Sequence, residues 1–207
     1  IDLYSNDQSV GVITRDDGDI LVAGTQGIDY TWNSNTDYGQ FVIVRLGYDG
    51  TNEATYKTNL GQGEFVETIA ELPDGKFLLV GTTESDFALT RHKPDGSLDT
   101  DFGTNGQVRT PIGNADDRAY GITVQPDGKL VVSGGAHNGQ NWDVALARYN
   151  NDGTLDNSFD NDGTLTTPAP GDDNARNVLV LDDARLLTLG TASSDFALNR
   201  YLGDSDQ

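Results

Sequence analysis

The chain has 207 residues, of which 33 are acidic and 13 basic, so its formal net charge is −20 at pH 7. Such a field repels phosphate backbones and anionic headgroups, so nucleic acid and membrane surfaces are excluded as expected partners. The lack of cysteine excludes disulfides and thiol chemistry. The chain begins at Ile1 and not at Met, which predicts a processed form or a segment of a longer protein.

A turn followed by a short apolar strand recurs four times along the chain. The turn aspartates are Asp17, Asp74, Asp127 and Asp183, a spacing of 53 to 57 residues. A repeat of this length, made of short strands and tight turns, predicts an all-β fold of the β-propeller type. Because one unit cannot bury its apolar faces alone, residues 1–207 are expected to form a single domain.

Each unit is expected to form a four-stranded antiparallel blade. In the third unit, apolar and polar residues alternate and turn residues separate the runs, which predicts strands at 119–125, 130–134, 143–149 and 163–167. By alignment with it, the predicted blades cover about residues 8–58, 65–110, 119–167 and 175–203.

The two ends of the chain predict how the blades are joined. Residues 1–4 align with the fourth strands of other units, and the last unit lacks a fourth strand of its own. We therefore expect residues 1–4 to complete the fourth blade and to close a four-bladed ring, which would cover both exposed edges. The alternative is a longer array of which this chain is a part.

Three motifs resemble those of the bacterial delta-sixty repeat family. They are Gln-Pro-Asp-Gly-Lys at 125–129, Asp-Phe-Ala-Leu-x-Arg-Tyr at 195–201, and Pro-Asp-Gly-Ser-Leu-Asp-x-x-Phe-Gly at 94–103. The resemblance covers essentially the whole chain and is weakest in unit one, which lacks the third motif after Arg45. It implies propeller-like blades in a large secreted or surface-anchored bacterial protein, hence an extracellular location. It implies no catalytic residue.

The units differ most in the loop between the second and third strands. This loop is 11 residues longer in unit one and 4 residues longer in unit three than in the other two, and it holds both tryptophans, Trp32 and Trp142. Function in repeat proteins lies where repeats differ. Aromatic rings beside amide side chains suit the recognition of sugars or of proteins. The competing interpretation is that each tryptophan folds down onto its own loop.

We predict a ligand site made of these loops and of the turns that enter the first strands of units three and four. In a four-bladed ring, the two loops would rise from one face, across the channel from each other. The expected ligand is a glycan or a protein, with no cofactor required. The predicted ligand-binding residues are Tyr30, Trp32, Asn33, Tyr38, His137, Asn138, Gln140, Trp142, Asp116, Arg118, Asp172 and Arg176.

Other polar residues have simpler interpretations. His92 replaces a strand tyrosine and is predicted to be structural, as are the repeated Asp and Arg of the third strands. On the opposite face, residues 150–163 are dense in oxygen ligands, which makes Ca²⁺ a candidate although the last Glu of an EF-hand is absent. The candidate ligands are Asp152, Asp156, Asp160 and Asp162.

Two alternatives to a recognition module stay open. The first is a structural spacer or assembly unit, which would self-associate or contact neighbouring domains of a larger chain. The second is a polysaccharide hydrolase or lyase that uses the paired carboxylates of residues 116–117 and 172–173 as general acid and base.

Overall fold

The computed structural model describes residues 7–27, 39–61, 65–113, 115–193 and 195–202. All regular structure in these ranges is β, arranged as four antiparallel sheets, which confirms the predicted all-β class. No helix among these residues is long and apolar enough to cross a membrane.

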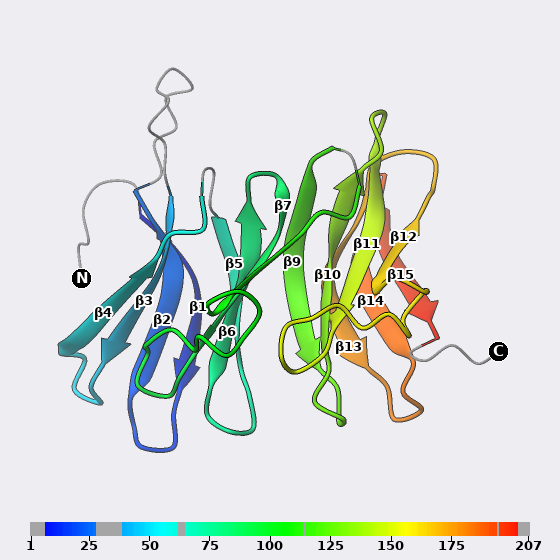
Figure 1. Cartoon of the computed structure of the whole chain (residues 1–207). Helices are drawn as coiled ribbons and strands as arrows, with labels where there is room; N and C mark the ends of the chain where they lie inside the picture. The colour runs from blue at the N-terminus through cyan, green and yellow to red at the C-terminus, as the bar shows by residue number, and fades with distance from the viewer. Residues whose placement is uncertain (1–6, 28–38, 62–64, 114, 194, 203–207) are drawn as a thin grey trace.

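Each sheet is a meander in which strands that follow one another in the chain are paired (Figure 1). The first sheet contains β1 (Gln8–Thr14), β2 (Ile20–Gln26), β3 (Gln40–Leu46) and β4 (Asn52–Thr58). The second contains β5 (Phe65–Glu71), β6 (Phe77–Thr83), β7 (Asp86–His92) and β8 (Gln107–Thr110). The third contains β9 (Asp117–Val124), β10 (Leu130–His137), β11 (Trp142–Tyr149) and β12 (Thr164–Thr167). The fourth contains β13 (Asp173–Val180), β14 (Leu186–Ala192) and β15 (Asp195–Tyr201).

The four sheets form an open array and not a closed ring. Each sheet packs on the next one in the chain, and the first and fourth sheets lie at opposite ends of the array (Figure 1). The prediction of a closed four-bladed ring is therefore wrong, because each sheet packs on the sheets next to it in the chain and the first and fourth sheets lie apart. The predicted closing strand, residues 1–4, lies outside the described residues. Repeats one and three consequently do not face each other across a channel.

The first strand of each repeat makes the contact with the sheet before it. β5 lies against β1, β2 and β3, β9 against β5, β6 and β7, and β13 against β9, β10 and β11. We call the side of a sheet that faces the next repeat its forward face and the other side its rear face. In the second sheet the forward face carries Leu78, Phe87 and Leu89, the rear face carries Phe77 and Leu79, and all five are fully buried.

A glycine in the second strand of each repeat lies opposite a β-bulge in the first strand. At Gly134 an added Cβ atom would lie only 2.0 Å from the carbonyl oxygen of Arg118. At Gly81 the corresponding distance to the Phe65 oxygen would be 1.8 Å. Only glycine permits this approach, and the extra residue that it accommodates increases the local twist of the first strand. The bulged residues are Val10, Glu67, Tyr120 and Arg176.

A buried ion-pair cluster joins three motifs of the second repeat. Asp99 pairs with Arg91 of β7 (Nε–Oδ2, 2.7 Å) and with Lys76 of the Asp-Gly turn (Nζ–Oδ2, 3.0 Å). The Arg91 guanidinium also lies 4.6 Å from the centre of the Phe102 ring and donates to the carbonyl oxygen of Asn151 in the next repeat. The predicted structural role of the third-strand arginine is thereby confirmed.

The same cluster recurs in the third repeat and is replaced in the first. Arg148, which is fully buried, pairs with Asp156 at 2.7 Å, and Lys129 pairs with the same carboxylate at 3.0 Å. In repeat one the lysine position holds Asp19, which accepts a hydrogen bond from Arg45 Nε at 2.5 Å. An acidic turn residue thus compensates for the motif that repeat one lacks.

The fourth Asp-Gly turn has alanine where the others have glycine. Ala184 adopts φ 63°, whereas Gly128 at the same position of repeat three adopts φ 85°. Because an L-residue is strained in this region, Ala184→Gly is expected to raise the unfolding free energy by about 1 kcal/mol. Thermal denaturation measures the change, with Gly128→Ala as the matched control that is expected to lower stability. A loss of stability in Ala184→Gly, or no loss in Gly128→Ala, would contradict this account.

His92 is buried, stacked on Phe77 with ring centroids 5.4 Å apart, and its Nδ1 lies 3.1 Å from the Gly96 carbonyl oxygen, as a structural role predicts. Burial lowers the pKa of His92 to about 4, against the opposing hydrogen bond to Gly96. At the same position Tyr149 donates to Thr110 of the preceding repeat at 2.8 Å.

Since the folded pKa of His92 lies below the unfolded value near 6.5, the folded state resists protonation. Its contribution to stability is complete above pH 6.5 and is lost as the pH falls toward 4. As the pH falls over this range, the unfolding free energy of His92→Tyr is expected to fall by up to about 3 kcal/mol less than that of the parent chain. Urea denaturation of both proteins between pH 4 and 7 measures the difference, and parallel pH profiles would contradict the prediction.

Candidate functional site

The predicted site residues of repeats three and four meet at one end of the sheets. Trp142 begins β11, is half-buried and pairs with His137, the last residue of β10. The two rings contact edge to face with centroids 5.3 Å apart, and the exposed Arg118 guanidinium lies 5.1 Å from the indole centre. Trp142 therefore packs on its neighbours and keeps part of its ring accessible.

Hydrogen bonds fix the loops around Trp142. Its backbone N–H donates to Asp172 Oδ1 at 3.1 Å, and the His137 N–H donates to the Asp116 carbonyl oxygen at 2.8 Å. The Asn141 amide, which the sequence did not single out, donates to the Ala169 oxygen at 2.9 Å and to the Gly171 oxygen. These bonds connect the loop of repeat three to the turn that enters repeat four.

Two of the predicted polar side chains have different surroundings. The Asn138 amide is used inside the loop, where it donates to Asp143 Oδ2 at 2.8 Å and accepts the Gln140 N–H at 2.9 Å. Gln140 itself is exposed. Asn138 thus shapes the loop, and Gln140 remains available to a ligand.

A second pairing of a guanidinium with an aromatic ring extends this surface along the bulges of the first strands. Arg176 lies 4.0 Å from the centre of the Tyr120 ring. Partial desolvation raises the pKa of Glu67, and the charges of Arg176 and Arg118 oppose that rise, so these groups share one electrostatic environment. A bulge re-aims its side chain. Tyr120 and Glu67 were not predicted from the sequence, where the glycine opposite each bulge is the signal that marks them.

The predicted site residues of repeat one are not part of the described structure. Tyr30, Trp32, Asn33 and Tyr38 lie outside the described residues. The surface that the structure defines, which we call the Trp142 surface, consists of Arg118, Tyr120, His137, Gln140, Trp142 and Arg176.

The paired carboxylates at this end are not equivalent. Asp117 is fully buried, and its Oδ2 accepts the backbone N–H of Ile112 at 2.7 Å. Burial raises the pKa of Asp117, opposed by its backbone hydrogen bonds. Asp173 is also buried and accepts the Ser193 N–H at 2.8 Å. One carboxylate of each pair therefore holds a turn and is withdrawn from any substrate.

The four candidate calcium ligands are not brought together. Among the described residues no three acidic or histidine side chains form a group that could hold a metal ion. Asp152 and Asp162 each accept the N–H and hydroxyl of the threonine two residues later, and Asp160 lies at a turn position with φ 46°. Asp156 belongs to the buried ion-pair cluster. Burial raises its pKa, but hydrogen bonds from Ser158 and Lys129 and the charge of Arg148 outweigh burial and lower it to about 2.

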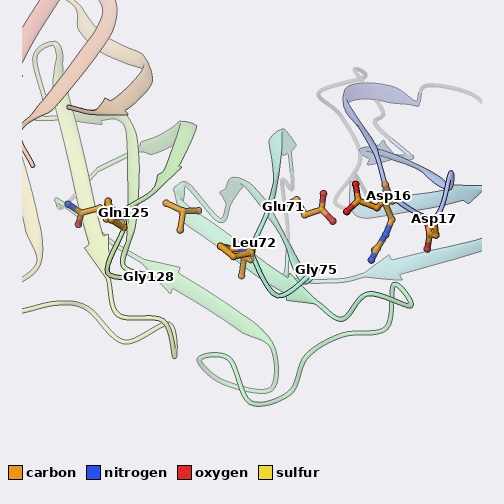
Figure 2. A pocket seen from close by; sticks show the side chains of 11 residues that line it. Asp16, Asp17, Glu71, Leu72, Gly75, Gln125 and Gly128 are labelled. Carbon is orange, nitrogen blue, oxygen red and sulfur yellow. The ribbon is translucent and has the colours of Figure 1, made fainter. Parts of the chain in front are cut away.

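A hollow of about 830 Å³ lies at the opposite end, among the Asp-Gly turns of the first three repeats (Figure 2). Asp16, Asp17 and Glu71 line one part of it, while Gln125 lies at the other end of the view. Arg15 also lines the hollow and donates to the Pro94 carbonyl oxygen at 2.8 Å. The hollow is wide and mostly lined by turn residues, and it contains none of the predicted site residues.

Comparison with known proteins identifies the repeats. Residues 72–102 and 125–159 match the model of a family described as "Domain of unknown function (DUF5122) beta-propeller". These two segments are similar to β-propeller repeats. The matched segments contain both buried Arg–Asp–Lys clusters, and the second segment also contains His137, Gln140 and Trp142.

No curated protein matches the sequence. Among solved structures, one similar chain is a "putative hydrolase" from Bacteroides ovatus ATCC 8483, at 13% identity and a TM-score of 0.43. The alignment covers 91% of this chain and 55% of that chain, so this chain spans just over half of the length of that structure.

The role of Asp156 separates a structural carboxylate from a metal ligand. Asp156→Asn removes the charge opposite the buried Arg148 and is expected to lower the unfolding free energy by about 3 kcal/mol. The loss is expected to be the same with calcium and with a chelator. The control Asp162→Asn removes an exposed turn carboxylate and is expected to cost less. If calcium stabilises the parent chain and not the Asp156 variant, the carboxylate is a metal ligand.

Proposed function

We propose that the chain is a non-catalytic recognition module that binds a glycan through the Trp142 surface. The observation that supports it is the exposed guanidinium of Arg118 stacked on a partly accessible indole. Indole rings cover the apolar faces of sugar rings, and guanidinium groups donate in pairs to carboxylates.

The charge of this surface favours an acidic glycan. The chain carries a formal charge of −20, yet two of its few arginines, Arg118 and Arg176, lie together here on aromatic rings. A neutral sugar needs only the rings and amides, whereas two exposed guanidinium groups suit a sugar that carries a carboxylate, such as a uronic acid. A protein ligand with an acidic segment is the other outcome that the test can reveal.

The resemblance to secreted bacterial repeats supports an extracellular setting for this module. Ligand binding needs no catalytic group. A hydrolase at this site would have one exposed carboxylate of each pair, because Asp117 and Asp173 are buried and accept hydrogen bonds from turn residues. Recognition is therefore the function that the geometry supports best.

Titration with acidic and neutral oligosaccharides, followed by tryptophan fluorescence and calorimetry, tests the proposal. Acidic oligosaccharides are expected to bind more tightly and to lose affinity as salt is added, because salt screens exposed charges. Trp142→Ala and Arg118→Ala are each expected to weaken binding by about tenfold or more. Arg185→Ala is the matched control, since Arg185 pairs with Asp183 in a turn outside this surface.

The two variants also separate binding from folding. Both side chains are partly or fully exposed, so the melting temperatures of the variants are expected to stay near that of the parent chain. Unchanged affinity in both variants would contradict the proposal. Binding of an acidic peptide, with no response to any oligosaccharide, would move the proposal to a protein ligand.

A further inference from the structure

Among the described residues, no sheet covers the forward face of the fourth sheet, which is apolar. Its residues are cross-strand neighbours: Leu179 pairs with Leu187, and Leu189 pairs with Leu198. Leu198 is 57% exposed and Phe196 is 72% exposed. At the same positions of the second sheet, Leu89 and Phe87 are 0% exposed, because the third sheet covers them.

The rear face of the first sheet is exposed in the complementary way. Val12 of β1 is 63% exposed and pairs with Val22 on the same face. Its counterparts in the later repeats are Ile69, Ile122 and Val178, which pair with the second strand in the same register. Each of these three residues packs into the core that its sheet shares with the sheet before it. Val12 thus has the position and chemistry of an interface residue without its interface.

Polar groups at the two ends of the array also match a contact that is made between inner repeats. Arg200 occupies the position of Arg91, which donates to the Asn151 carbonyl oxygen in the turn of the following repeat. The corresponding turn of repeat one contains Tyr48, which is 88% exposed, and Asp49. A following repeat with this turn would place the Asp49 carboxylate close to the Arg200 guanidinium.

We propose that a second copy of this chain covers the fourth sheet, with its β1 seated on β13, β14 and β15. The contact continues an interface that the chain already makes three times, between the first strand of one repeat and three strands of the repeat before it. Since the two surfaces are different, the contact is head to tail and either closes into a ring or grows into a filament. A ring of two copies would contain eight sheets, within the range of known propellers of about 4 to 8 blades.

Sedimentation velocity and light scattering over micromolar to submillimolar concentrations test this proposal on the whole chain. The mass is expected to rise above the 22.2 kDa of one copy as concentration increases, and more so at high salt, where repulsion between acidic chains is screened. A monomer at every concentration, at both low and high salt, would overturn the proposal.

Two blocked variants test the geometry of the contact. Phe196→Asp with Leu198→Asp removes the forward surface, and Val12→Asp removes the rear surface. Each variant alone is expected to self-associate at least about tenfold more weakly than the parent chain. An equimolar mixture of the two is expected to form a dimer that does not grow, because one intact forward face meets one intact rear face. Phe65→Asp, the same change on the inner second sheet, is expected to associate like the parent.

The alternatives give different results. A two-fold contact between two forward faces predicts that Val12→Asp still dimerises, and this result would overturn the head-to-tail arrangement. Failure of the mixture to form a dimer would do the same. Because the exchanged side chains are exposed, all variants are expected to melt near the parent temperature, which shows that the monomers are folded.

Discussion

The whole array depends on one contact, in which the first strand of a repeat lies across three strands of the sheet before it. Through this contact Phe87 and Leu89 of the second sheet become fully buried, whereas Phe196 and Leu198 at the same positions of the fourth sheet stay exposed. The sequences of these strands are nearly the same, so the difference in burial comes from the neighbour alone. A single repeat on its own would leave these apolar faces exposed to water.

A second constraint explains why particular polar residues recur. Burying the guanidinium of Arg148 or Arg91 is costly unless its charge is paired and its N–H groups are bonded. The lysine of the Asp-Gly turn, the arginine of the third strand and the aspartate of the following loop meet for this reason, with a phenylalanine under the guanidinium. Repeat one shows that the requirement is for charge balance and not for a fixed motif, since Asp19 there takes the lysine position and pairs directly with Arg45.

The strands and their order could be predicted from the sequence because turn glycines and apolar alternation are local signals. The closed ring could not, since closure depends on how successive sheets are oriented on one another, which no single residue encodes. Arg118, His137 and Trp142 could be predicted to share one end because strand direction fixes where each loop lies. Arg176 was predicted as a site residue, but its partner Tyr120 was not. A bulge changes the direction of a side chain without changing the apolar pattern around it.

The bulges also explain where chemistry can vary in such a fold. Most positions on the covered forward and rear faces are apolar, since each of these faces packs on a neighbouring sheet. The bulged residue is the one position of the first strand that has no partner in the strand register, so it is free to differ, and it does: Val10, Glu67, Tyr120 and Arg176 are apolar, acidic, aromatic and basic in turn. A ligand that lies along the array therefore meets a different side chain from each repeat on an otherwise repeating scaffold. Under the proposed function, specificity would depend on which side chain each bulge presents, while the glycine opposite it keeps the backbone the same.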